Sequence, residues 1–437
     1  MSTVPAAAPD LAVTPTATST ASVPPAAPVA PGGPSNGADD IEVHAVRFCG
    51  TGAGYFRVWF VNLVLMVLTL GLYTPWARRR TARWFYDHTE VAGSPLEFAA
   101  PMRRMVFGFL VFAGLYIAYE IASNTGQEAV AFTMLGLAAV FAPLIWRAAM
   151  RFRMASTRWR GLQLRFSASV GEVYRASWPV ALIAAVWAAV IAAGIALGTG
   201  DDADRAARVA RVGLAAMVLP LATLAALLAS ALLFVRLGYG YQRLLFERGG
   251  LGDESGRFKP TFRAFLRISL IAGGVWIGLV GAFGLGAFLL LGGAVGDLGA
   301  LLGPIDDLRD SARWASLAVV ILTPICLALV AVPLYAWREA RLFALVWNGA
   351  GLGRIVRTQC TLSAAGFTWL RTVNVVLTLI TLGLWRPFAR VREYRMKVES
   401  VRLHVRGGLD TVTGRLQAQT GGVGDMLADA AGLDLIG

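Results

Sequence analysis

Residues 62–83 read Asn-Leu-Val-Leu-Met-Val-Leu-Thr-Leu-Gly-Leu-Tyr-Thr-Pro-Trp-Ala-Arg-Arg-Arg-Thr-Ala-Arg. The apolar run holds one amide, Asn62, and ends at a helix-breaking Thr69-Leu70-Gly71-Leu72 before passing through Pro75 and two aromatic residues into four arginines. Apolar side chains in lipid, aromatic rings at the headgroups and arginines beyond them are typical of a membrane segment that meets the cytoplasmic surface. We therefore predict that this stretch is a membrane element.

The same pattern recurs near the other end of the sequence, without a gap and at a constant offset of 312 residues. The matching residues of the second copy are Asn374, Thr381, Gly383, Pro387, Arg390, Arg392 and Arg395. Weaker similarity at offsets of 68, 160 and 258 indicates that a unit of membrane run, arginine-rich amphipathic helix and glycine-centred turn with an aromatic strand is used about five times. Repeated membrane units are common in transport proteins and also occur in scaffolds.

The amino-acid composition indicates a membrane protein rather than a soluble one. The chain has 437 residues, of which 56% are apolar and only 15% charged, whereas a soluble domain carries about a quarter of charged residues. Repeated runs of about eighteen or more apolar residues predict transmembrane helices. The formal net charge is +13, but the basic residues follow the ends of apolar runs, which indicates contact with the bilayer and anionic phospholipids rather than with nucleic acid.

The sequence divides into three regions. Residues 1–42 are rich in Ala and Pro and predict a disordered tail, residues 43–410 form a repeat-built membrane domain, and residues 411–437 form a short acidic tail. The eight apolar runs of the membrane domain are 55–74, 105–122, 129–146, 178–199, 212–235, 268–296, 314–335 and 367–385.

Charge on the connections predicts the topology. Segments 75–104, 147–177, 236–267 and 338–357 are rich in arginine, whereas 123–128, 199–211 and 297–313 are not. By the positive-inside rule the first group is cytoplasmic, so runs two to seven cross the membrane as six transmembrane helices. The first and last runs either cross or are re-entrant. The N- and C-termini are predicted to be cytoplasmic.

Short alternating segments at 43–48, 88–98, 158–167 and 398–406 predict strands. They would pair only if they lie on one side of the membrane, which favours the re-entrant alternative. The expected fold is an all-α polytopic membrane protein with a small cytoplasmic β-sheet.

The repeated element, Asn-x6-Thr-Leu-Gly-Leu followed by an aromatic residue, Pro75 or Pro387, and arginines, resembles the YjgN family over about residues 46–410. These are bacterial inner-membrane proteins whose defining domain, domain of unknown function 898, has no established activity. The resemblance therefore implies a multi-pass inner-membrane protein and transfers no catalytic residues. The second copy departs from the first at Arg371, where the first has Trp59.

No nucleophile motif, phosphate-binding loop or metal-ligand spacing is visible, so we predict no enzyme, no cofactor and no metal site. Three sets of residues remain as candidates. Asn62 and Asn374 either face a shared polar cavity or bond neighbouring helices, and Glu120, alone in its apolar run, is either a member of that cavity or exposed to water. The repeat motif comprises Thr69, Gly71, Pro75, Thr381, Gly383 and Pro387. The arginines Arg78, Arg80, Arg83, Arg390, Arg392 and Arg395 either anchor the protein at the membrane surface or bind an anionic headgroup or solute.

Two functions fit these observations. The first is a transporter or channel-like protein for a small anionic or lipidic solute. The second is a structural or lipid-organising scaffold that binds a partner through its basic cytoplasmic face.

Overall fold

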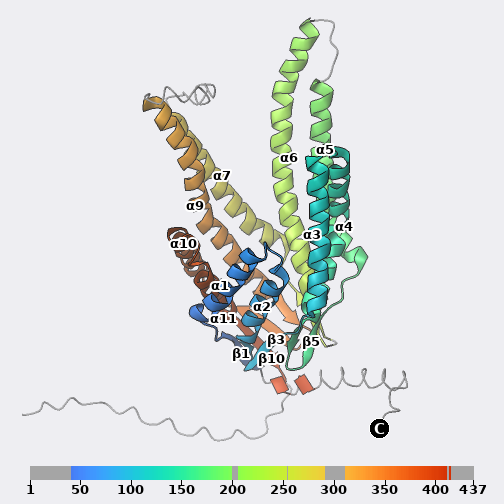
Figure 1. Cartoon of the computed structure of the whole chain (residues 1–437), viewed down its shortest axis with the longest axis vertical. Helices are drawn as coiled ribbons and strands as arrows, with labels where there is room; N and C mark the ends of the chain where they lie inside the picture. Colours follow the sequence, from blue (N-terminus) through green and yellow to red (C-terminus); the bar gives the residue numbers. More distant parts are fainter. Residues whose placement is uncertain (1–40, 199–204, 253, 291–310, 411–412, 415–437) are drawn as a thin grey trace, which may run out of the picture.

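Long helices rise from a β-barrel at one end of the molecule (Figure 1). A computed structural model of the chain describes residues 41–198, 205–252, 254–290, 311–410 and 413–414, without the side chains of 198, 205–208, 287–290, 311–322 and 324. The two predicted tails lie outside the described residues, apart from residues 41–42, which begin the first strand, and residues 413–414. Of the connections predicted at 199–211 and 297–313, residues 199–204 and 297–310 also lie outside them.

Ten antiparallel strands close the barrel in the order β1-β10-β9-β8-β7-β6-β5-β4-β3-β2. Their bounds are β1 Ile41–Phe48, β2 Thr89–Val91, β3 Ser94–Phe98, β4 Thr157–Trp159, β5 Leu162–Phe166, β6 Gly249–Leu251, β7 Glu254–Phe258, β8 Ala350–Leu352, β9 Val356–Cys360 and β10 Val401–Arg406. Because the first and last strands pair, with Val43 opposite His404, the two ends of the described chain close the ring.

The barrel is built from five similar hairpins. In four of them a strand of three residues is followed by a strand of five. The tightest turns have positive φ at two successive residues, Ala92 (49°) with Gly93 (75°) and Arg160 (48°) with Gly161 (79°), as type I′ turns require. The fifth hairpin is split, since β10 and β1 come from opposite ends of the chain.

One hydrogen bond recurs five times around the ring. In each case the residue after the longer strand donates its backbone N–H to a carbonyl at the end of the second helix of the hairpin that follows. The five bonds are Cys49 to His88 (2.9 Å), Ala99 to Ser156 (2.8 Å), Ser167 to Arg248 (2.9 Å), Lys259 to Gly349 (2.9 Å) and Thr361 to Ser400 (2.8 Å). This regularity shows that the fold is a closed ring of five repeats.

Five helical hairpins connect the strands. Three are long: α3 Met102–Asn124 with α4 Glu128–Ala155, α5 Val170–Gly198 with α6 Arg205–Arg248, and α7 Phe262–Leu290 with α9 Ser311–Gly349. Two are short: α1 Gly52–Leu68 with α2 Thr74–Asp87, and α10 Ala364–Ile380 with α11 Arg386–Glu399. Figure 1 shows α7 and α9 leaning away from α5 and α6, with the short hairpins nearer the barrel. The four arginine-rich connections all contain barrel strands, so they lie together at this end.

The expected fold class is corrected in two respects. The small sheet is in fact a closed ten-stranded barrel, because 249–258 and 350–360 also form strands although neither alternates clearly in hydropathy. The six transmembrane helices are not confirmed: within the described residues, five helices are long and apolar enough to cross a bilayer. The seventh run, 314–335, lies in α9, where the structure does not describe the side chains of 311–322 and 324.

The repeat motif forms the tips of the two short hairpins. Helix α1 ends where Leu70 (φ 48°) and Gly71 (φ 88°) adopt left-handed conformations, and Leu382 (50°) and Gly383 (93°) do the same after α10. The N–H of Gly71 bonds the carbonyl of Met66 at 2.8 Å, which satisfies a terminal carbonyl of the helix. Each short hairpin therefore carries the chain away from the barrel and back to it.

The motif threonines act identically in the two copies. Thr69 donates to the carbonyl of Leu65 (2.7 Å) and accepts from the N–H of Tyr73 (3.0 Å). Thr381 donates to Leu377 (2.7 Å) and accepts from Trp385 (3.0 Å). The proline that follows, Pro75 or Pro387, is buried within the first turn of the returning helix, where it needs no backbone donor.

Candidate functional site

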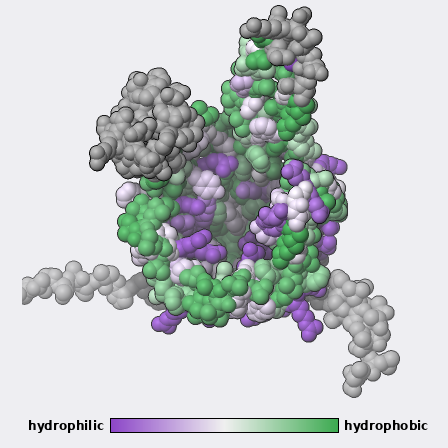
Figure 2. All heavy atoms as spheres, turned by 45° about the horizontal axis from the view of Figure 1, so that its top comes forward, coloured by the Kyte–Doolittle hydropathy of each residue, from purple (hydrophilic) through white to green (hydrophobic). Residues whose placement is uncertain are grey.

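A cavity of about 1100 Å³ lies between the short hairpin α1–α2 and parts of α4, α6 and α11. Apolar side chains form much of its wall, including Leu63, Met66 and Met150, together with the aromatic rings of Trp59 and Phe85. Figure 2 looks into the space between the helices and shows hydrophilic residues on its walls, whereas the outer flanks are mainly hydrophobic. The site is thus amphipathic, as a chamber for an amphipathic molecule requires.

Four arginines give the cavity its charge. Arg78 comes from α2, Arg153 from α4, and Arg386 and Arg390 from α11. Arg78 and Arg390 are equivalent residues of the two repeat copies. No aspartate or glutamate is among the lining residues, so the cavity favours an anion.

Arg390 is held in place by aromatic side chains. Its Nη1 donates to the hydroxyl of Tyr55 at 3.2 Å, and its guanidinium lies 5.4 Å from the ring centre of Phe85. The same aromatic cluster of Phe48, Tyr55 and Phe85 packs the two repeat copies against each other. The packing leaves the guanidinium's remaining N–H groups available for an anion.

Asn62 lines this cavity, and one of its side-chain atoms has no hydrogen-bond partner among the described residues. Its side chain is 5% exposed, and its Nδ2 donates to the carbonyl of Ala77 and to Oγ1 of Thr81, each at 3.4 Å. Its Oδ1 is buried without a hydrogen-bond partner among the described residues. A buried acceptor without a partner is destabilising, so Asn62 contributes less to stability than a fully bonded amide at this position would.

Asn374 does not line this cavity. It is 1% exposed, and its Nδ2 donates to the carbonyl of Ala389 (3.4 Å) and to Glu393 (3.2 Å). Its Oδ1 accepts from Arg392 at 3.4 Å. The structure therefore separates the two asparagines: each bonds the returning helix of its own hairpin, and only Asn62 reaches the cavity.

Charged residues account for this difference between the copies. Arg371 bonds Glu339 of α9 at 2.6 Å and lies 3.6 Å from Glu393, and Lys397 pairs with the same Glu339. These ion pairs tie the second hairpin to α9. The equivalent positions in the first copy are uncharged, namely Trp59, Thr81 and Phe85, and all three face the cavity.

The other predicted site residues are dispersed. Glu120 lies near the end of α3 away from the barrel, beside Asn124, and does not line the cavity. Arg80 and Arg83 are exposed, and Arg395 donates to the carbonyl of Gly50 at 2.7 Å, which fastens the two copies together. The predicted roles of these residues, in a polar cavity or in contact with an anion, stay predictions.

The barrel beneath is filled with apolar side chains. Trp159, Leu162 and Val405 are buried in its centre, joined by Leu409 from the segment that follows β10. A remaining space of about 240 Å³ has almost entirely apolar walls. Apolar walls of this kind disfavour the passage of ions.

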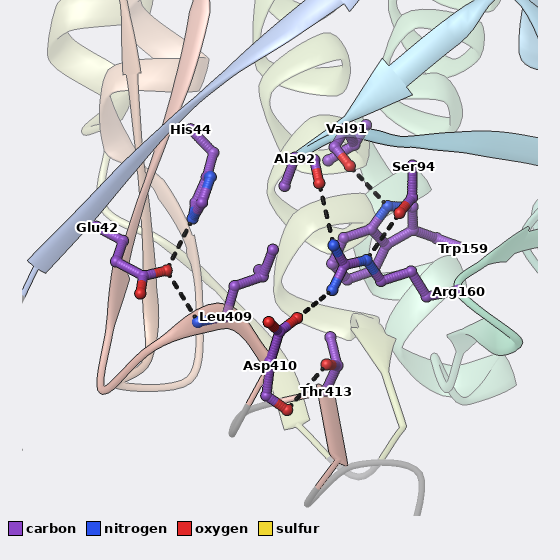
Figure 3. A network of polar contacts seen from close by, with 10 residues as sticks. All are labelled: Glu42, His44, Val91, Ala92, Ser94, Trp159, Arg160, Leu409, Asp410 and Thr413. Carbon is purple, nitrogen blue, oxygen red and sulfur yellow. Dashed lines mark hydrogen bonds and ion pairs between the residues drawn. The ribbon is translucent and has the colours of Figure 1, made fainter. Parts of the chain in front are cut away.

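Polar contacts hold that final segment across the barrel mouth (Figure 3). The N–H of Leu409 donates to Oε2 of Glu42 at 3.0 Å, and Nη1 of Arg160 donates to Oδ1 of Asp410 at 2.8 Å. The Leu409 N–H and then His44, at 3.0 Å, hold the pKa of the Glu42 carboxyl below its usual value. We refer to residues 409–410 and these contacts as the mouth latch.

Two of these features were not predicted from the sequence. Arg153 and Arg386 carry no signal that distinguishes them from the other arginines. The mouth latch joins residues near opposite ends of the chain, and no sequence pattern indicates that contact. Within the described residues, no three His, Cys, Asp or Glu side chains gather as metal ligands.

Known protein families and curated proteins include matches to this chain. The family described as "Bacterial protein of unknown function (DUF898)" matches residues 43–430. The chain is 27% identical over 149 residues to inner membrane protein YjgN of Escherichia coli O157:H7, covering 34% of this chain and 37% of the relative. It is 26% identical over 146 residues to the protein of the same name from Salmonella typhimurium strain LT2, covering 33% and 37%. No solved structure matches it.

The matched region therefore spans little more than a third of these curated relatives. Their printed name, together with five helices of membrane-spanning length in the described residues, identifies this chain as a multi-pass bacterial inner-membrane protein. The side of the membrane on which the termini lie stays a prediction. Because the family match covers most of the chain and the predicted resemblance is confirmed, the chain belongs to the DUF898 family.

Proposed function

We propose that the protein binds an anionic, amphipathic solute in the cavity and moves it through the ring of repeats, as a transporter or channel-like protein. The observation that carries this proposal is the set of four arginines from α2, α4 and α11 in a largely apolar chamber with no acidic residue. Guanidinium groups bind phosphate and carboxylate by paired hydrogen bonds, while the apolar wall suits a hydrocarbon portion.

The position of the cavity supports the same class of solute. The exposed tips of the short hairpins carry Leu70 and Leu382, each 94% exposed. Leucines this exposed fit hydrocarbon better than water, so we place these tips in the bilayer. A solute in the cavity would then have its charged group at the arginines and its apolar part toward the lipid.

The experiment is flux from proteoliposomes that contain the full chain. Two probes are compared, a short-chain phosphatidic acid and inorganic phosphate, so that lipidic and small anionic solutes are distinguished. The cavity variant combines Arg78→Gln with Arg390→Gln. We expect it to reduce flux at least tenfold, because each charge-assisted hydrogen bond contributes roughly 1.5–3 kcal/mol.

The matched control is Arg103→Gln with Arg104→Gln, which removes the same charge from exposed positions at the start of α3. Because Arg390 also bonds Tyr55, the single variant Arg78→Gln, at an exposed position, tests the cavity without this packing effect. Equal flux in the cavity and control variants would refute the role of the arginines.

One observation favours the second candidate, a lipid-organising scaffold. Apolar side chains pack in the barrel and the latch holds its mouth, which disfavours passage of a charged solute through the described barrel. Absence of flux for both probes, with binding of the lipid retained, would support the scaffold and exclude transport of these solutes.

A further inference from the structure

A second basic site lies on the outer surface, in a groove of about 290 Å³ between α5 and α6. We call it the outer groove, and its charged and aromatic residues are Glu172, Arg175, Trp178, Arg236, Arg243, Glu247 and Arg248. On α6 these residues lie on the opposite side of the helix from Gln242 and Leu245, which line inward cavities. The outer groove is therefore separate from the cavity of the proposed function.

Two of its four arginines are neutralised. Arg248 pairs with Glu172, and Nε of Arg243 donates to Glu247 at 2.9 Å. Within the described part of the chain, Arg175 and Arg236 form no ion pair. The groove thus holds two positive charges that have no acidic partner in the described structure.

Arg236 is fixed in position by aromatic rings. Its guanidinium lies 5.4 Å from the ring centre of Tyr239 and 5.2 Å from that of Phe262. These contacts orient the guanidinium without neutralising its charge. The side chain is only half-buried, so its charge remains accessible at the groove.

The groove lies where α5 becomes a membrane helix. Trp178, which is 46% exposed, stands at the start of the apolar run, and Val180 and Leu182 beyond it are also exposed. Tryptophan is enriched at the level of lipid headgroups. A molecule whose phosphate lies at the arginines would have its acyl chains beside these apolar residues.

We propose that the outer groove binds the phosphodiester headgroup of an anionic membrane phospholipid. The two unneutralised arginines bind the phosphate, Trp178 packs at the glycerol level, and the exposed apolar face of α5 contacts an acyl chain. Basic pockets between membrane helices bind anionic headgroups in this way.

The test uses the full chain in nanodiscs of phosphatidylcholine, titrated with phosphatidylglycerol and read by native mass spectrometry. The variant Arg175→Gln with Arg236→Gln is compared with the control Arg103→Gln with Arg104→Gln. Each arginine near a membrane surface contributes about fivefold to affinity, so we expect a roughly 30-fold weaker affinity in the groove variant and no change in the control.

The single variant Arg175→Gln tests the groove with little effect on folding, because Arg175 is exposed. We expect it to weaken phosphatidylglycerol binding about fivefold. Equal phosphatidylglycerol affinity in the groove and control variants would overturn the proposal. Binding of soluble glycerol 3-phosphate as tight as that of the lipid would also overturn it, because the site would then recognise a free phosphate. The groove variant is also measured in an Arg78→Gln background, which weakens binding of the lipid in the cavity. The roughly 30-fold loss caused by the two groove substitutions should persist there, which separates this site from the cavity.

Discussion

The two repeated asparagines should respond differently to the same substitution. Asn374→Leu removes the three hydrogen bonds of the amide, which are 3.2–3.4 Å long. The amide Nδ2 donates to the carbonyl of Ala389 and to Glu393, and its Oδ1 accepts from Arg392. Hydrogen bonds between membrane helices contribute on average ~0.6 kcal/mol each and up to ~1.7, and two of these involve charged groups. We expect a loss of about 2 kcal/mol in the free energy of unfolding.

Asn62→Leu should have a much smaller effect on stability. It removes two long hydrogen bonds of 3.4 Å, but it also removes the buried Oδ1, which has no described partner. An unpaired buried acceptor costs about 1–3 kcal/mol, so the two effects largely offset each other. We expect a change below about 1 kcal/mol, together with weaker binding of the cavity solute.

The assay is equilibrium unfolding in mixed micelles with increasing dodecyl sulfate, followed by tryptophan fluorescence. The difference between the two variants is the measured quantity, because the substitution and the membrane environment are matched. Equal losses of stability would refute the reasoning, since they would mean that Asn62 is as fully bonded as Asn374. A loss of solute binding in Asn374→Leu but not in Asn62→Leu would reverse the assignment of the site.

Three further predictions follow from the fold. Gly71→Ala should destabilise the short hairpin by about 1 kcal/mol, because Gly71 has a φ of 88°, which a residue with a Cβ adopts at a cost. A Cβ there would meet no atom within 4 Å, so the loss, measured by thermal unfolding, comes from the backbone alone. The lowered pKa of Glu42 means that its contribution to stability is present above its unfolded pKa and is lost as pH falls through the folded one. The protection of the Leu409 amide against hydrogen exchange, relative to its intrinsic rate at each pH, should therefore fall in acid, and Glu42→Gln should remove this pH dependence. Phe367→Ala, at a position that is 0% exposed against α9, should lose about 3–5 kcal/mol in chemical unfolding, whereas Trp369→Ala, at 72% exposure, should change little.

Local patterns predicted the helical elements and their repetition. The gapless offset of 312 residues predicted that both short hairpins share one geometry, and their threonine bonds and left-handed Leu-Gly tips agree closely. Arginine-rich connections also predicted which ends of the helices lie together. These features depend on residues near each other in the sequence, so one chain is sufficient to recognise them.

Hydropathy alternation did not identify strands β6 to β9, although the repeated unit predicted a strand in each copy, and the cause is physical. Their residues include Gly249, Gly250 and Gly256, which have no side chain to alternate between faces. The glycines are required by close packing: a Cβ at Gly256 would lie 1.8 Å from the carbonyl oxygen of Phe246. Without these strands, the four visible segments predict only a small sheet rather than a closed ring.

The sequence by itself determined a membrane protein of repeated units, with basic residues at one end of the helices and a breaker at the tip of each short hairpin. Only the tertiary structure decided that the repeats close into a ring, that Asn62 faces a cavity while Asn374 is fully bonded, and which arginines share a site. The physical reason is that hydropathy and turn signals act over a few residues. Ring closure instead depends on β1 pairing with β10, and the contrast between the asparagines depends on Glu339 of α9 pairing with Arg371 and Lys397.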